Sequence, residues 1–314
     1  MTASKPALFS PLALGATRAP NRLTLAALPS GCASADGRAG DALCAYYLER
    51  ARGGLGVIVT EPVWPVAPPT VAQPHLALYD DSFIPDLSAS LAAVHGAGVA
   101  AIVMLDQPLD LAQLSGAALA EIGAAFVTAA WRARTAGADG VMLSTCDGGP
   151  FAQLVSPLLN QRGDQHGAGI DGRLWLLTSV VEGIGRWLGP EVVIGVRLIV
   201  EEFAHGGITL HDARVMARRL VSAGVRLLEI GTRHTGDSPL AQFPGWKLPL
   251  AAAIRAVVDV PVLVGGQMDD VELADAAVRD GSADLIDVAE CLLSEPLWPL
   301  KARAALAASL RASP

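Results

Sequence analysis

The sequence predicts an α/β protein with a (β/α)8 TIM barrel, and a doubly wound open sheet is the second candidate. Eight short apolar runs rich in Val, Ile and Leu alternate with longer amphipathic segments. The runs are apolar throughout rather than alternating with polar residues, as parallel strands under a layer of helices are. No Pro/Ser-rich linker divides the 314 residues, and barrels of this size commonly form one domain. We therefore expect residues 1–314 to form a single barrel domain.

Each strand candidate is followed by a helical stretch, such as 41–53, 117–137 and 210–224, and several of these end in the glycine that favours a helix C-terminus. In a barrel the active site lies at the carboxyl ends of the strands. The strand candidates are 23–28, 56–61, 100–105, 140–144, 192–199, 226–231, 260–266 and 283–289.

Composition narrows the classes of partner. The net charge of −8 argues against nucleic acid and against anionic membranes. The four cysteines are scattered, without a C-x-x-C pair, so neither a metal site nor a disulfide framework is indicated. The sequence shows no apolar run of about 18 residues and no secretory leader. These features predict a cytoplasmic protein with a small-molecule ligand, and a homo-oligomer stays open.

The segment 137–167, GADGVMLSTCDGGPFAQLVSPLLNQRGDQHG, resembles the fourth strand and following loop of the Old Yellow Enzyme family of flavin oxidoreductases. The similarity extends nearly end to end, through the segments 8–23, 46–61, 94–105, 194–231 and 260–301. The resemblance implies the barrel fold, an FMN cofactor and reductase chemistry.

Several residues that the family uses for chemistry are replaced here. Ser144, Asp147 and Gly149 stand where the family has two substrate-binding residues (His and His or Asn) and a proton-donating tyrosine. Met104 replaces the glutamine that binds the flavin pyrimidine edge, and a thioether cannot both donate and accept as an amide does. Ala289-Glu290 replaces the Gly-Arg pair that holds the FMN phosphate. The stretch 108–116 is also shorter than the family's loop after the third strand.

Other family features are kept: Gly265-Gly266 of the second phosphate loop, and Arg197, which in the family faces the flavin. We predict three catalytic candidates. Arg197 would polarise a carbonyl or an enolate, and Asp147 or Glu290 would move a proton if burial raised its pKa. Each also has a structural interpretation.

In the structural interpretations, Arg197 pairs with Glu61 or Glu229, Asp147 caps a turn, and Glu290 pairs with Arg233. The residues expected to line the substrate pocket are Leu28, Glu61, Trp64, Met104, Gln107, Ser144, Gly149, Arg233, His234, Gly265, Gly266 and Gln267.

The missing residues lead to four hypotheses. The one we favour is a cofactor-independent cyclase, in which the vacated flavin cavity folds a large apolar polyketide-type intermediate for ring closure, cycloaddition or isomerisation. The alternatives are an FMN-dependent ene-reductase or NAD(P)H:flavin oxidoreductase, a non-redox enzyme that keeps flavin as a structural element, and a catalytically dead scaffold. The favoured hypothesis expects no cofactor.

Overall fold

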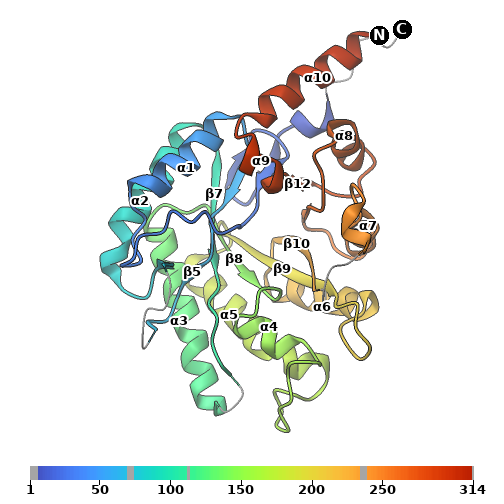
Figure 1. Ribbon diagram of the computed structural model, residues 1–314. Coiled ribbons are helices and arrows are strands. Elements are labelled where there is room, and N and C mark those ends of the chain that lie inside the picture. The colour runs from blue at the N-terminus through green and yellow to red at the C-terminus, as the bar shows by residue number, and fades with distance from the viewer. Residues whose placement is uncertain (1–5, 69–73, 112–113, 234–238, 313–314) are drawn as a thin grey trace.

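A computed structural model describes residues 6–68, 74–111, 114–233 and 239–312, and its centre is a closed parallel barrel (Figure 1). The strands follow the chain around the barrel, and pairing of β4 with β7 closes it. All eight predicted strands are confirmed. They are β3 (Leu23–Leu25), β4 (Val57–Val59), β7 (Ala100–Leu105), β8 (Gly140–Ser144), β9 (Val193–Glu201), β10 (Leu227–Thr232), β11 (Val262–Val264) and β12 (Leu285–Asp287).

Helices surround the barrel, and the three that were predicted by residue range are present as α1, α3 and α6. Two short strands, β5 (Val63–Trp64) and β6 (Leu76–Ala77), extend the sheet beside β7. The helices are α1 (Asp41–Arg52), α2 (Ile84–Gly96), α3 (Gly116–Thr135), α4 (Pro150–Val155), α5 (Gly169–Leu188), α6 (Leu210–Ala223), α7 (Leu248–Arg255), α8 (Val271–Arg279), α9 (Ala289–Ser294) and α10 (Trp298–Ala312), with 3₁₀ turns η1 (Ala7–Phe9), η2 (Asp81–Phe83) and η3 (Pro239–Gln242).

The barrel interior is a packed apolar core of inward-facing side chains. Inward side chains such as Ile102, Met142 and Leu263 are almost wholly buried against one another. A hairpin of β1 (Leu12–Leu14) and β2 (Thr17–Ala19) adds Leu14 and Ala19 to this core and covers the amino-terminal end of the barrel. Ligands are therefore confined to the opposite, carboxyl-terminal end.

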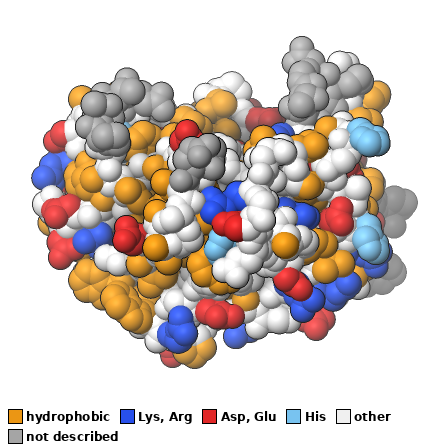
Figure 2. Space-filling view, turned by 90° about the horizontal axis from the view of Figure 1, so that it is seen from below, with side chains coloured by type: hydrophobic (Ala, Val, Ile, Leu, Met, Phe, Trp, Pro, Cys, Tyr) orange, Lys and Arg blue, Asp and Glu red, His pale blue; other side chains and the backbone are white. Residues whose placement is uncertain are grey.

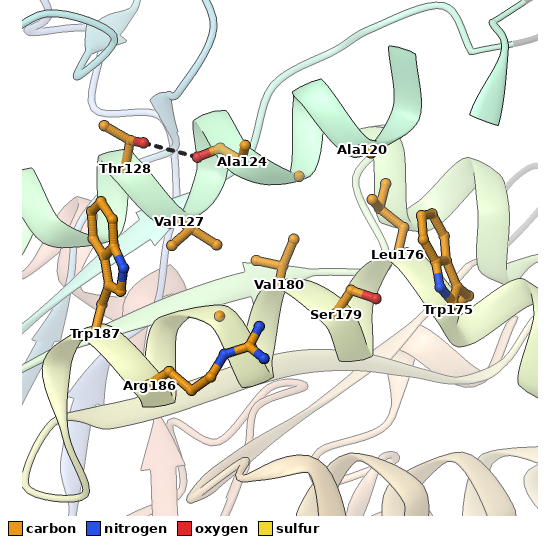
Figure 3. A pocket seen from close by; sticks show the side chains of 12 residues that line it. Ala120, Ala124, Val127, Thr128, Trp175, Leu176, Ser179, Val180, Arg186 and Trp187 are labelled. Carbon is orange, nitrogen blue, oxygen red and sulfur yellow. Dashed lines mark hydrogen bonds between the residues drawn. The ribbon is translucent and has the colours of Figure 1, made fainter. Parts of the chain in front are cut away.

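The outer wall carries a groove between α3 and α5, of about 340 Å³, with Trp175 and Trp187 at its two ends (Figure 3). Its floor is shallow because Gly123 and Gly183 let the two helices approach closely; an added methyl group at Gly183 would lie 2.8 Å from Val127. Arg186 is the one charged residue in its lining. The groove lies outside the barrel and away from the strand ends, so it supplies none of the groups that catalysis needs.

The surface mixes charge and apolar side chains. On the face shown in Figure 2, acidic and basic side chains lie interspersed among hydrophobic ones, so charge of one sign forms no continuous area there. Within the described ranges, no helix combines the length and the apolar character needed to cross a lipid bilayer.

Asp139 ties the amino-terminal end of the barrel together. Its carboxylate accepts hydrogen bonds from Thr17 Oγ1 at 2.6 Å and from the Ala101 backbone N–H at 2.8 Å, and it pairs with His95 Nε2 at 2.9 Å. Burial opposes ionisation of Asp139, but the bonds from His95, Thr17 and Ala101 outweigh it and lower the pKa of the carboxyl. The ionised aspartate thus joins the hairpin, α2 and β7.

We predict that Asp139→Ala lowers the free energy of unfolding by about 1–3 kcal/mol, because it leaves the N–H of the buried Ala101 without an acceptor and removes the bonds to Thr17 and His95. Chemical denaturation of both proteins near neutral pH measures the difference. The lowered pKa means that this stabilisation is present above the unfolded-state pKa and is lost as pH falls through the folded-state value. The gap between the two proteins should therefore shrink in acid; a gap independent of pH would contradict this account.

Candidate functional site

Arg197 is the centre of the polar site at the carboxyl ends of the strands. It lies on β9 directly between Ser144 of β8 and Glu229 of β10 in the strand register. Its Nε donates to Glu229 Oε1 at 2.8 Å, its Nη1 to Asp147 Oδ2 at 3.1 Å, and its Nη2 to the Ala27 carbonyl oxygen at 3.2 Å. The side chain is 13% exposed, so its position is fixed from three sides.

The electrostatics of this group favour charge on the arginine. Burial alone would lower the pKa of Arg197, but Glu229 and Asp147 raise it above the ordinary value. Burial raises the pKa of Glu229, and the Arg197 guanidinium opposes that rise. Of the two structural partners suggested by the sequence for Arg197, the structure selects Glu229 and gives Glu61 a different role.

Asp147 belongs to this cluster as well as to a turn. Its Oδ2 accepts from Ser144 Oγ at 2.7 Å as well as from Arg197. Ser144 Oγ in turn accepts from the Cys146 backbone N–H at 3.1 Å. Asp147 therefore both caps its turn, through Ser144, and pairs with Arg197 at the site.

A cavity of about 360 Å³ opens beside this cluster, at the ends of β4 and β7; we call it the tryptophan cavity. It unites four residues that the sequence placed at the site: Glu61, Trp64, Gln107 and Asp147. Glu61 Oε2 is held at 2.6 Å by the Ser30 backbone N–H, and the Trp64 ring stacks on His75 at 3.8 Å between centroids. The remaining lining residues are Pro29, Pro62, Pro74, His75, Asp106 and Pro108.

Asp106 is a further candidate for a functional role, and the sequence did not single it out. It follows β7, is 3% exposed and lines the tryptophan cavity. Burial, and then the charge of Asp147, raise its pKa to about 7, against the opposing effects of the Gln107 backbone N–H and Arg197. A carboxylate directly after a buried strand was the available sequence clue, because such positions face the active end of a barrel.

A second cavity, of about 430 Å³, lies at the ends of β11 and β12; we call it the acidic cavity. It contains three predicted site residues, Gly266, Gln267 and Glu290, together with the carboxylates Asp269 and Asp287. Asp287 accepts from the backbone N–H groups of Ala26 and Ala289, at 3.1 and 2.8 Å, and its burial raises its pKa. The remaining lining residues are Met268, Val288, Cys291 and Ser294.

The other predicted site residues lie outside the two cavity linings. Met104 packs inside the barrel core, and Leu28 packs partly buried against the outer core. Gly265 lies against Asp287, and Arg233 pairs with the buried Glu202 at 2.6 Å rather than with Glu290. His234 lies outside the described residues, and so does part of the shortened stretch 108–116.

Comparison with known proteins agrees with this architecture. The family model described as NADH:flavin oxidoreductase / NADH oxidase family matches residues 7–108 and 106–309. A "NADH oxidase" of Thermoanaerobacter brockii is 29% identical over 95% of this chain and 51% of its own length. A "Metal reductase" of Desulforamulus reducens is 30% identical over 94% of this chain and 48% of its own. The chain thus spans about half the length of these two relatives.

A shorter relative and two solved structures also match most of the chain. An "NADPH dehydrogenase" of Halalkalibacterium halodurans is 28% identical over 82% of both chains. Among solved structures, a 2-naphthoyl-CoA reductase in complex with 2-naphthoyl-CoA superposes with a TM-score of 0.86 at 22% identity, covering 94% of this chain and 51% of that one. An old yellow enzyme homologue from Zymomonas mobilis gives 0.78 at 22% identity, covering 94% and 92%. These likenesses confirm the fold.

The prediction of a cofactor-independent cyclase is wrong, and so is the expectation of no cofactor. The relatives are oxidoreductases by name, and the family model is that of flavin oxidoreductases. The physical reason is visible in the tryptophan cavity. We expected the lost histidines and tyrosine to leave a dry apolar space, but Glu61, Asp106 and Asp147 line it beside a buried arginine. Such a charged lining does not suit a large apolar polyketide.

The buried pair of Arg197 and Glu229 yields a prediction about stability. Arg197→Met should lower the free energy of unfolding by about 3–5 kcal/mol, because Glu229 then keeps a buried charge without its partner. Denaturant unfolding measures the loss. The matched control is the double variant Arg197→Met/Glu229→Met, which removes both charges and should recover most of it. Equal losses in the single and double variants would show that the pairing is not what stabilises this region.

Proposed function

The chain belongs to the NADH:flavin oxidoreductase / NADH oxidase family, and from that premise we propose that it is a flavin-dependent oxidoreductase that passes two reducing equivalents from NADH or NADPH to a small acceptor. The supporting observation is the fixed, charged cluster around Arg197 at the carboxyl ends of the strands, beside a cavity large enough for a small molecule. The hypothesis of a catalytically dead scaffold fits this site less well. Packing alone does not require a buried arginine at the carboxyl ends of the strands.

The arginine end of the site fits part of a flavin. The described residues engage three of the five N–H donors that a guanidinium carries, at Glu229, Asp147 and Ala27. The remaining donors suit carbonyl or anionic oxygens, and the resemblance assigns Arg197 to the flavin face. A bound flavin would supply the hydride and electron transfer itself, while the protein orients it and tunes its surroundings.

The phosphate end does not fit an FMN phosphate. The acidic cavity occupies the place that the resemblance gives to the phosphate, and its lining includes Asp269, Asp287 and Glu290 without a lysine or arginine. Carboxylates and a phosphate dianion repel one another, and the family's charge-assisted arginine contact is replaced by Glu290. We therefore propose that the flavin is held mainly through its ring end.

The protein's own residues prepare the acceptor site. The Ser30 backbone N–H fixes the Glu61 carboxylate, and the stacked Trp64 and His75 rings form one wall of the tryptophan cavity. The acceptor we propose is small and carries a carbonyl or similar oxygen, because the cavity of about 360 Å³ combines aromatic walls with hydrogen-bonding groups.

The four cysteines are free, which supports a reducing, cytoplasmic location as part of the same proposal.

The function is tested with the purified protein, riboflavin or FMN, and NADH or NADPH, using a quinone or an activated enone as acceptor. We expect flavin-dependent loss of the nicotinamide absorbance, with turnover well above that of free flavin. A protein that accelerates none of these combinations beyond the free-flavin rate would overturn the proposed function. Heat-unfolded protein at the same concentration serves as the control for flavin chemistry in solution.

The charge of the acidic cavity leads to a separate prediction. Riboflavin should bind at least as tightly as FMN, and Glu290→Arg should raise FMN affinity about tenfold or more, corresponding to one charge-assisted hydrogen bond of about 1.5–3 kcal/mol. Quenching of flavin fluorescence measures both dissociation constants. Riboflavin binding should change little in this variant.

The matched control is Glu182→Arg, which makes the same change of net charge on the exposed face of α5, outside both cavities. It should leave the FMN affinity near the wild-type value. If the wild type already prefers FMN over riboflavin strongly, the phosphate finds a cationic partner elsewhere and our account of the acidic cavity is wrong.

A further inference from the structure

The backbone at Gly149 does not require glycine. Gly149 precedes α4 with φ −69° and ψ −175°, an extended conformation that residues with side chains adopt readily. What excludes a side chain is the carboxyl of Asp106, the residue that follows β7. A methyl group added at Gly149 would overlap Oδ1 of the Asp106 carboxyl and lie 3.1 Å from its Oδ2. The Asp106 carboxyl therefore occupies the space into which a residue at 149 would project.

The Asp106 carboxyl combines a buried, unpaired oxygen with a position at a cavity wall. Its Oδ1 is buried and accepts no hydrogen bond from the described residues, which is costly for an ionised oxygen. The same residue lines the tryptophan cavity, beside Trp64 and Gln107. The free-energy cost of an unpaired oxygen at a cavity wall is removed if the oxygen carries a proton or accepts a hydrogen bond from a ligand.

We propose that Asp106 is the acid that delivers a proton to the acceptor in the tryptophan cavity, in the place that the resemblance gives to a tyrosine at position 149. This inference rests on the proposed oxidoreductase function. In the step, the nicotinamide nucleotide is oxidised by loss of a hydride, and the acceptor gains one hydride equivalent at one atom of a C=C or C=O bond. The Asp106 O–H bond breaks, its proton bonds to the other atom, and the carboxylate regains a proton from water.

The charged groups around Asp106 support a protonated carboxyl near neutral pH. Asp147 from the loop after β8 disfavours a second negative charge, and Glu61 and His75 line the same cavity from β4 and the segment before β6. Arg197 on β9 acts in the opposite direction, but its charge is shared with Asp147 and Glu229. Burial is the largest effect and brings the pKa of Asp106 to about 7, the range in which a general acid works best.

The experiment compares wild type with Asp106→Asn, which keeps the shape and removes the transferable proton. We expect kcat to fall roughly 10²-fold or more, as is typical for loss of a general acid, with KM for the nucleotide little changed. Wild-type kcat should fall as pH rises through about 7, because the acid must be protonated, and that limb should vanish in the variant. An unchanged kcat and pH profile in Asp106→Asn overturns the inference.

Asp147→Asn provides a second signature. Removing the neighbouring charge should lower the pKa of Asp106 and move the limb of the wild-type pH profile to lower pH. A purely structural role for Asp106 would not produce this shift. The swap D106G/G149Y tests the shared space directly: it should recover part of the turnover that D106G loses, whereas Gly149→Ala alone should clash with Asp106 and lower stability.

Two readouts do not depend on turnover. In protein labelled with ¹³C at aspartate carboxyls, one resonance that is absent from Asp106→Asn should titrate near 7; titration near the ordinary aspartate value overturns the inference. Because the folded-state pKa is the raised one, wild type should lose stability relative to Asp106→Asn as pH rises from about 4 to about 7. If the wild type oxidises no nucleotide, the proposed function fails, and the carboxyl titration alone decides whether Asp106 is the acid of this cavity.

Discussion

The buried charge of Arg197 is the constraint that organises the active end of this barrel. A guanidinium at a barrel strand needs anionic partners close by, because an unpaired buried charge costs several kcal/mol. The parallel register supplies one partner, since Glu229 on β10 lies directly beside Arg197 on β9. The loop after β8 supplies the other through Asp147, which Ser144 holds in place. Strand order and loop conformation are thus coupled through one side chain.

Burial raises the pKa of Asp106 and Asp287, and Arg197 opposes that rise with a charge that it shares among several carboxyls. Glu229 and Asp147 share the single positive charge, so little of it is left to stabilise an ionised Asp106. Asp287 at the end of β12 is partly buried and accepts hydrogen bonds from two backbone N–H groups. Negative charge is therefore already abundant at the strand ends, and the site gains most from ligands that bring neutral or hydrogen-bonding groups. This explains why the two cavities differ so clearly in what they can hold.

The eight strands and the position of the site were readable from sequence because fully buried parallel strands are continuous apolar runs, and their carboxyl ends meet at one face. The pairing of Arg197 with Glu229 was also predictable, since the two residues lie opposite each other in the register of neighbouring strands. The proposed pairing of Glu290 with Arg233 was wrong because Arg233 turns to the buried Glu202, which itself binds Ser156. Side chains from separate loops meet in ways that local sequence does not encode.

The wrong prediction of function has a physical lesson in Gly149 and Asp106. A missing catalytic side chain indicates lost chemistry only when the space it leaves is empty. Here the space at position 149 is filled by a carboxyl from the end of β7, far away in the chain and invisible to a comparison made position by position. The same reasoning applied at the acidic cavity gives the opposite result: Glu290 replaces an arginine, and the carboxylates Asp269 and Asp287 around it restore no positive charge. The proposed acid thus supplies from the end of β7 what position 149 lacks, whereas the lining of the acidic cavity contains no lysine or arginine for a phosphate.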